Sequence, residues 1–204
     1  AEKHRTEFGS KTILDVKNIP LHCNIIFFCL PTHNEVKSVI SEMRENLNET
    51  HILIDCTSSD CSVQKEIYND LIESNIYFFD APVSGGPEKA FTGELTCMVG
   101  GNRNKFIEIE SVLKTISNPI YVGDVGNGCA IKSINNILNV SHLCLASEAL
   151  QSLSDLGIDK KVALEVINKS SGKSLMTEER LPVDVFEKNY NFGFSLGLMN
   201  KDVG

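Results

Sequence analysis

The chain has 204 residues, of which 19 are Lys or Arg and 27 are Asp or Glu, giving a formal net charge of −8. This acidic balance argues against nucleic acid as a partner, because phosphate binding needs clustered cationic side chains. No apolar run reaches the roughly 20 residues that span a bilayer, so we expect no membrane partner either.

The spacing of the cysteines and histidines indicates in which kind of compartment the protein works and whether it binds a metal. Seven cysteines are scattered along the chain without a C-x-x-C pair. An odd number at irregular spacing indicates reduced thiols, which predicts an intracellular, reducing location. The five histidines form no pair at metal-ligand spacing, so we expect no metal site.

The first half of the chain alternates strands and helices. Residues 24–30, 51–55 and 76–80 are apolar runs of strand length, and apolar residues at helical spacing follow the first two, over 32–48 and 59–74. Strands that are apolar on both faces belong to parallel sheets with both faces covered. The series therefore predicts a parallel α/β sheet.

After this series, residues 87–93 are expected to form a connector. A strand over 94–99, a short helix over 104–116 and a short strand over 119–122 then follow. Three glycines, Gly123, Gly126 and Gly128, mark a change in the sequence, and beyond them the sequence predicts helices. These helices are expected at about 126–150, 159–169, 174–180 and from Ser195 onwards. We place a domain boundary at the glycines, with an α/β domain over 1–123 and an all-helical domain over 124–204.

Lys132, Asn135 and Asn136 stand at i, i+3 and i+4 in the long helix, so they project from one of its faces. A lone helical lysine is most often simply solvated. An amine and two amides on one apolar helix face are nevertheless costly for a purely structural element. This face is the first candidate site.

Ligands of open α/β sheets bind at the carboxyl ends of the strands. Leu30-Pro31-Thr32 follows the first strand, and the hydroxyl-rich turn 55–59, which could hydrogen-bond a ribose or a phosphate, follows the second. The third strand leads into DAPVSGG, residues 80–86, where the Ser84 hydroxyl and successive backbone N–H groups suit a carboxylate. An SGGP sequence alone is more often a plain turn. No G-x-G-x-x-G occurs, so these residues indicate only an enzyme that acts on a small acid.

Four motifs in order make the sequence resemble the β-hydroxyacid dehydrogenases: FFCLPT, DAPVSGG with GELTCMVGG, GNGCAIKSINN and FSLGLMNKD. The resemblance covers about residue 9 to the end. It implies a partial Rossmann-like parallel-sheet domain that lacks the first β-α-β elements, joined through the long helix to a partial all-α substrate and dimerisation domain. The chain is accordingly expected to be a fragment, inactive by itself, of a longer protein.

The resemblance also implies residue roles. Lys132 matches the catalytic lysine, which exchanges a proton with the substrate oxygen. An ordinary lysine has a pKa of about 10.4 and needs desolvation to act as a base near neutrality. The expected substrate-binding residues are Ser84, Gly85, Gly86, Asn136 and, as an orienting neighbour, Asn135. The expected cofactor-binding residues are Leu30, Pro31, Thr57, Ser58, Lys201, Asp202 and Phe194. Glu35 departs from the family pattern, because an asparagine that contacts the cofactor is common at this position.

The implied activity is NAD- or NADP-dependent oxidation of a 3-hydroxy acid, most simply 3-hydroxyisobutyrate to methylmalonate semialdehyde in valine catabolism. A reductase for tartronate semialdehyde or glyoxylate shares most of these motifs and is the alternative enzyme. A catalytically inactive dehydrogenase fold that serves as an interaction module is the alternative outside enzymes. The resemblance further implies a homo-oligomer, dimer or tetramer, formed through the helical domain, in the mitochondrial matrix or the cytoplasm.

Overall fold

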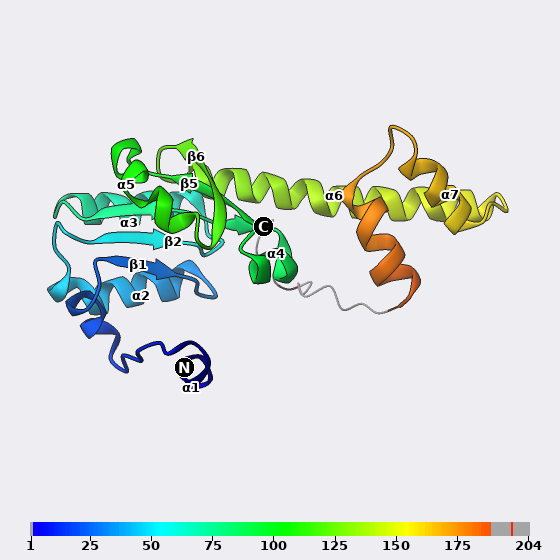
Figure 1. The fold of residues 1–204 in the computed structure, drawn as a ribbon. Helices are drawn as coiled ribbons and strands as arrows, with labels where there is room; N and C mark the ends of the chain where they lie inside the picture. Colours follow the sequence, from blue (N-terminus) through cyan, green and yellow to red (C-terminus); the bar gives the residue numbers. More distant parts are fainter. Residues whose placement is uncertain (1, 189–196, 198–204) are drawn as a thin grey trace. The chain divides into compact units, whose positions relative to one another are not determined.

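The computed structural model describes residues 2–188 and residue 197 (Figure 1). The chain divides into two compact units, Ala1–Lys132 and Ser133–Gly204, and each is described by itself. The first unit is an α/β domain and the second is helical, as the sequence patterns predicted.

The first three strands of the sheet lie side by side and run parallel, which confirms the prediction from their apolar runs. They are β1 (Ile25–Phe28), β2 (Ile52–Asp55) and β3 (Tyr77–Asp80). Asp55 and Asp80 are register partners at the carboxyl ends of β2 and β3. Both aspartates are fully buried.

The rest of the sheet is mixed. Strand β5 (Leu95–Gly100) runs antiparallel to β3, with Gly100 opposite Asp80, and antiparallel to the short β4 (Val83–Ser84). Strand β6 (Ser117–Gly123) pairs in parallel with β5 and is longer than the strand predicted there. Strand β4 was not predicted, because two residues are too few to leave a periodic pattern.

Capping side chains set the starts of the helices that flank the sheet. Helix α2 (His33–Met43) begins where the Thr32 hydroxyl accepts a hydrogen bond from the Asn34 N–H. Helix α3 (Cys61–Ile72) begins where Asp60 accepts from the Ser62 N–H. Helix α5 (Arg103–Leu113) is capped in the same way by Asn102. Short polar side chains at the position before a helix satisfy backbone donors that have no partner within the helix.

The core has two layers because successive side chains of a strand point to opposite faces. Leu53 and Phe78 pack with α2 and α3 on one face, whereas Ile54 and Phe79 pack with α5 on the other face. Strands β2 and β3 are thus covered on both faces, which accounts for their uninterrupted apolar sequence.

The segment expected to be a connector at residues 87–93 is instead a helix, α4 (Gly86–Thr92). Pro87 lies in its first turn, where the missing N–H of proline has no helical partner to lose. The N-terminal region also forms elements that its sequence did not predict: α1 (Glu2–Phe8) and the 3-10 helix η1 (Val16–Leu21). Helix α2 ends earlier than expected, with the 3-10 turn η2 (Arg44–Asn46) after it.

The helical part of the chain contains α6 (Asn127–Asp155), α7 (Lys160–Asn168) and η3 (Met176–Phe186). Helix α6 begins in the first unit, and the greater part of it belongs to the second. Leu150, Ala163, Leu164 and Leu181 form the core of the second unit. Among the described residues, no helix is long and apolar enough to cross a membrane. The helix expected from Ser195 lies outside the described residues.

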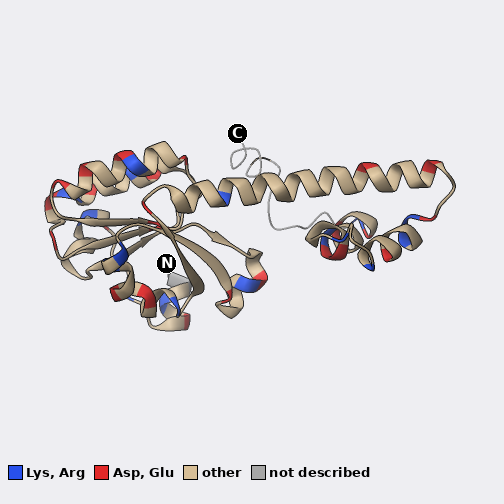
Figure 2. Ribbon diagram, turned by 90° about the horizontal axis from the view of Figure 1, so that it is seen from above, with Lys and Arg blue, Asp and Glu red and all other residues tan. Residues whose placement is uncertain are grey.

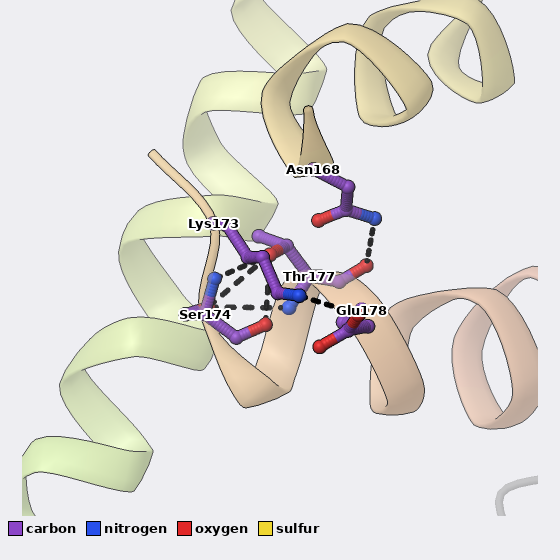
Figure 3. Close-up of polar contacts among 5 residues, drawn as sticks. All are labelled: Asn168, Lys173, Ser174, Thr177 and Glu178. Atoms are coloured by element: carbon purple, nitrogen blue, oxygen red, sulfur yellow. Dashed lines mark hydrogen bonds and ion pairs between the residues drawn. The ribbon is translucent and has the colours of Figure 1, made fainter. Parts of the chain in front are cut away.

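The start of η3 is fixed by a reciprocal pair of hydroxyl groups (Figure 3). The Ser174 N–H donates to the Thr177 hydroxyl at 2.8 Å, and the Thr177 N–H donates to the Ser174 hydroxyl at 3.2 Å. An ion pair of 2.7 Å between Lys173 and Glu178 closes the same turn. The helix continues past the expected Arg180 with π geometry, whose wider turns accommodate Pro182 in the interior.

Candidate functional site

The start of α6 is capped by a residue of strand β3. One carboxylate oxygen of Asp80 accepts a hydrogen bond from the Gly126 N–H, and the other accepts from the Cys129 N–H, both at 2.8 Å. Gly126, the residue before the helix, has no side chain with which to cap it. A carboxylate from a neighbouring strand therefore satisfies two N–H groups at this terminus and is favourably placed in the field of the helix.

Lys132 follows one turn after this cap and is partly buried. It is the only Lys or Arg within residues 127–155. Figure 2 shows the helix as almost wholly uncharged along its length. Its acidic residues, Glu148 and Asp155, lie about four or more turns further along, so the surroundings of Lys132 on the helix resemble a site for proton transfer more than a solvated, charge-rich face.

Asn135 and Asn136 occupy the next turn of α6. Asn136 is buried, with 8% of its surface exposed, and Asn135 is partly buried. Among the described residues, nothing accepts a hydrogen bond from the buried amide nitrogen of Asn135. A buried donor left unpaired costs about 1–3 kcal/mol, so such a group calls for a functional explanation.

The loops after β1 and β2 are tied together by Thr57. Its side chain is buried, and its hydroxyl accepts from the Leu30 N–H at 3.1 Å. Asp55 in turn accepts from the Thr57 N–H at 2.9 Å and from the Gln64 side-chain amide at 2.7 Å. Sequence reasoning expected Thr57 to contact the cofactor. In the structure the Thr57 hydroxyl holds the backbone of Leu30, and its contact with the cofactor stays a prediction. Pro31 beside Leu30 is exposed, and Ser58 is partly buried.

The SGG segment lies where β4 meets α4. Ser84 ends β4, opposite Thr96 of β5. Gly85 and Gly86 are exposed and have φ angles of 140° and 74°. Side chains are rarely accommodated at such angles, which explains why two glycines follow the serine. The exposed backbone is accessible to a small ligand, as its predicted role requires.

Glu35, which departs from the family pattern, acts locally in the cap of α2. Its carboxylate accepts a hydrogen bond from the Thr32 hydroxyl, and this bond is the main cause of a lowered pKa for Glu35. Thr32 and Glu35 therefore interact across the first turn of α2.

Three predicted cofactor-binding residues, Phe194, Lys201 and Asp202, lie outside the described residues. Within the described part of the chain, no group of three or more His, Cys, Asp or Glu side chains could hold a metal ion.

The described residues fit one part of a dinucleotide. The strand-end loops with Leu30, Pro31 and Ser58 lie at the carboxyl ends of parallel strands, where such sheets bind their ligands. Within the first unit, the exposed Gly85–Gly86 backbone provides N–H groups suited to a small acid, and the unpaired amide of Asn135 belongs to the second unit. A glycine-rich loop for the pyrophosphate is absent from this sequence.

Sequence reasoning did not identify Asp80, Asp55 or Gln64 as residues that hold this arrangement. The sequence could have indicated a structural role for Asp80, because a charged residue at the end of an apolar strand must form hydrogen bonds when it is buried. Its partners Gly126 and Cys129 could not be named from the sequence.

Comparison with known proteins gives the class first. Residues 3–126 match the family described as the NAD-binding domain of 6-phosphogluconate dehydrogenase. Residues 126–204 match the family described as the NAD-binding domain of NADP-dependent 3-hydroxyisobutyrate dehydrogenase. The fold is therefore Rossmann-like, and the class is that of NAD(P)-dependent oxidoreductases.

Individual relatives narrow the class to a family. The chain is 32% identical over 200 residues to 2-(hydroxymethyl)glutarate dehydrogenase of Eubacterium barkeri, covering 96% of this chain and 66% of that protein. It is 32% identical over 212 residues to human mitochondrial 3-hydroxyisobutyrate dehydrogenase, covering 99% and 63%. The structure of Mycobacterium tuberculosis 3-hydroxyisobutyrate dehydrogenase with L-serine superposes with a TM-score of 0.83 at 25% identity, covering 91% and 66%.

The chain belongs to the 3-hydroxyisobutyrate dehydrogenase family, whose members are NAD(P)-dependent 3-hydroxyacid dehydrogenases. It spans slightly less than two thirds of the length of the two relatives compared by sequence.

Burial gives Asp80 a pH-dependent effect on stability. Desolvation raises its pKa from 3.8 to about 6, against the opposing effect of the two N–H donors. A raised folded-state pKa means that the contribution to stability is fully present below the unfolded pKa and is lost as the pH rises through the folded one. We expect the unfolding free energy of the wild type, relative to Asp80→Asn, to fall by ~2 kcal/mol between pH 4 and pH 7. Urea unfolding of both full-length proteins at each pH measures this difference, and a rise with pH would contradict it.

Proposed function

We propose that the complete protein oxidises a 3-hydroxy acid with NAD or NADP, with Lys132 as the general base and 3-hydroxyisobutyrate as the preferred substrate. The observation that carries this proposal is the arrangement on α6. Its only Lys or Arg, Lys132, precedes by one turn an asparagine with an unpaired buried amide and a second, buried asparagine. Family membership supplies the reaction class.

Each residue has one task in this proposal. Ser84 and the backbone of Gly85 and Gly86 bind the substrate carboxylate. Asn135 and Asn136 hold the substrate hydroxyl, and the Lys132 Nζ removes its proton. A bound nicotinamide would supply the hydride acceptor for the carbon that bears this hydroxyl, so that the alcohol would become an aldehyde. The strand-end residues Leu30, Pro31, Thr57 and Ser58 are proposed to line the cofactor side, together with Phe194, Lys201 and Asp202.

The lack of charge on the proposed substrate-binding residues favours a substrate with a single carboxylate. Ser84, Gly85, Gly86, Asn135 and Asn136 are all uncharged, and Lys132 is assigned to the hydroxyl. The second carboxylate of 2-(hydroxymethyl)glutarate would need a further charged or hydrogen-bonding partner. The enzyme from Eubacterium barkeri nevertheless matches this chain at the same identity as the human enzyme, which makes its substrate the second candidate.

The test is a comparison of kcat/KM on the full-length protein with NAD and with NADP. The acids are 3-hydroxyisobutyrate, 2-(hydroxymethyl)glutarate and L-serine, with tartronate semialdehyde and glyoxylate in the direction of reduction. We expect 3-hydroxyisobutyrate to exceed the others by at least about 10-fold, the discrimination that one mismatched group usually gives. A higher value for another substrate would overturn the substrate assignment, and no turnover of any of them would overturn the reaction class.

Self-association through the helical unit, and a mitochondrial or cytoplasmic location, are proposals that rest on the family resemblance. Light scattering of the full-length protein decides the first, and a monomer would contradict it. Imaging of the tagged full-length protein in its own cells decides the second.

A further inference from the structure

Asp80 is surrounded by glycines that leave it no room to move. A Cβ on Gly100 would overlap one Asp80 carboxylate oxygen, and a Cβ on Gly128 would lie 2.8 Å from the other. Gly126, whose N–H donates to Asp80, supplies a third glycine at the same place. The carboxylate thus lies directly between β5 and the first turn of α6.

Both carboxylate oxygens are acceptors here, and each receives one backbone N–H. An asparagine in the same place would offer one oxygen and one NH₂ group. The NH₂ group would face a backbone N–H of Gly126 or Cys129, and two donors cannot form a hydrogen bond with each other. Two acceptor oxygens therefore suit this place better than an amide does, and the two hydrogen bonds join the start of α6 to the end of β3.

We propose that Asp80 is a positioning residue for the reaction, which fixes the first turn of α6 and thereby aims Lys132. This inference rests on the proposed function of Lys132, three residues after the capped Cys129. All of these residues belong to the first unit of the chain. A displacement of a catalytic group by about 1 Å can lower turnover by ~10²-fold, so the fixing of one helical turn has a large effect.

Asp55 is the matched control that the structure offers. It is the register partner of Asp80, is equally buried, and also accepts two hydrogen bonds. Its donors are Thr57 and Gln64, which lie in the loop after β2 and in α3, and neither belongs to α6. Asp80→Asn and Asp55→Asn therefore remove the same carboxylate from adjacent strands. Only Asp80→Asn disturbs the hydrogen bonds to the start of α6.

The test is a double-mutant cycle in the full-length protein. We expect Asp80→Asn to lower kcat by at least about 10-fold in the wild-type background and by less than about threefold in a Lys132→Ala background, because residues that act through one another are not additive. We expect Asp55→Asn to lower kcat by less than Asp80→Asn does. Equal losses from Asp80→Asn in the two backgrounds, or a wild-type kcat in the single variant, would overturn the inference.

A second readout does not depend on turnover. Backbone hydrogen exchange at Gly126 and Cys129 is expected to accelerate at least about 10-fold in Asp80→Asn and to stay unchanged in Asp55→Asn. If Asp80→Asn does not fold, Asp80→Ser, which keeps one acceptor without added bulk, replaces it in both experiments. Should Lys132→Ala retain full turnover, the proposed function fails. The exchange comparison then still decides whether Asp80 fixes α6, and equal exchange in the two aspartate variants refutes this.

Discussion

Replacement of Lys132 with alanine in the full-length protein is expected to lower kcat by at least about 10²-fold, the usual contribution of a general acid–base residue. The affinity for the cofactor should change little, because the proposed contact of Lys132 is with the reacting hydroxyl. Steady-state kinetics at saturating cofactor and substrate measure the first quantity, and calorimetric titration with the cofactor measures the second.

Two further variants test whether the loss of activity comes from proton transfer. One keeps the positive charge at position 132, and the other removes a lysine elsewhere on the surface. Lys132→Arg keeps the positive charge, but a guanidinium cannot give up its proton near neutrality, so its kcat should be as low as that of Lys132→Ala. Lys114→Ala removes an exposed lysine that forms an ion pair with Glu110, and its kcat should match the wild type. Full activity in Lys132→Ala would refute the assignment and would favour the catalytically inactive interaction module.

Replacement of Gly128 with alanine is expected to destabilise the full-length protein by about 3 kcal/mol, the usual scale for forced overpacking. The new Cβ would overlap the Met98 carbonyl oxygen and would lie 2.8 Å from both the backbone oxygen and a carboxylate oxygen of Asp80. These atoms belong to the buried residues Met98 of β5 and Asp80 of β3, and backbone atoms in paired strands cannot shift cheaply. The result would be a displaced α6 and a fall of about 10 °C in Tm, measurable by calorimetry.

Gly172→Ala is the control for this substitution. Its Cβ would meet only a methyl carbon of Ile167 at 3.4 Å, which is ordinary van der Waals contact. We expect its stability to stay within about 0.5 kcal/mol of the wild type. Equal stabilities for the two alanine variants would show that α6 does not depend on close contact with the end of β3.

Elements with a local cause could be predicted from the sequence. Strands β1 to β3 are uninterrupted apolar runs, and α2 and α3 begin at the capping residues Thr32 and Asp60. Helix α4 was expected to be a connector, although its Pro87 lies in the first turn, where proline is common in helices.

In the candidate site, too, the residues with a local cause could be predicted and the others could not. Helical spacing alone places Lys132, Asn135 and Asn136 on one face, since these residues lie within two turns of one helix. The roles of Asp80 and Thr57 depend instead on contacts between distant segments. Asp80 is 46 positions before Gly126, and Thr57 is 27 positions after Leu30. No local pattern encodes such pairs, because they follow from the register of the sheet.

The cap on α6 also has a consequence for the order in which the protein folds. Most of α6 can form from contacts close in sequence, whereas its first turn gains its acceptor only after β3 has entered the sheet. We therefore expect the turn that leads to Lys132 to acquire its native structure after the body of the helix. During refolding, a chain could therefore carry a largely formed α6 while its proposed catalytic centre was unassembled.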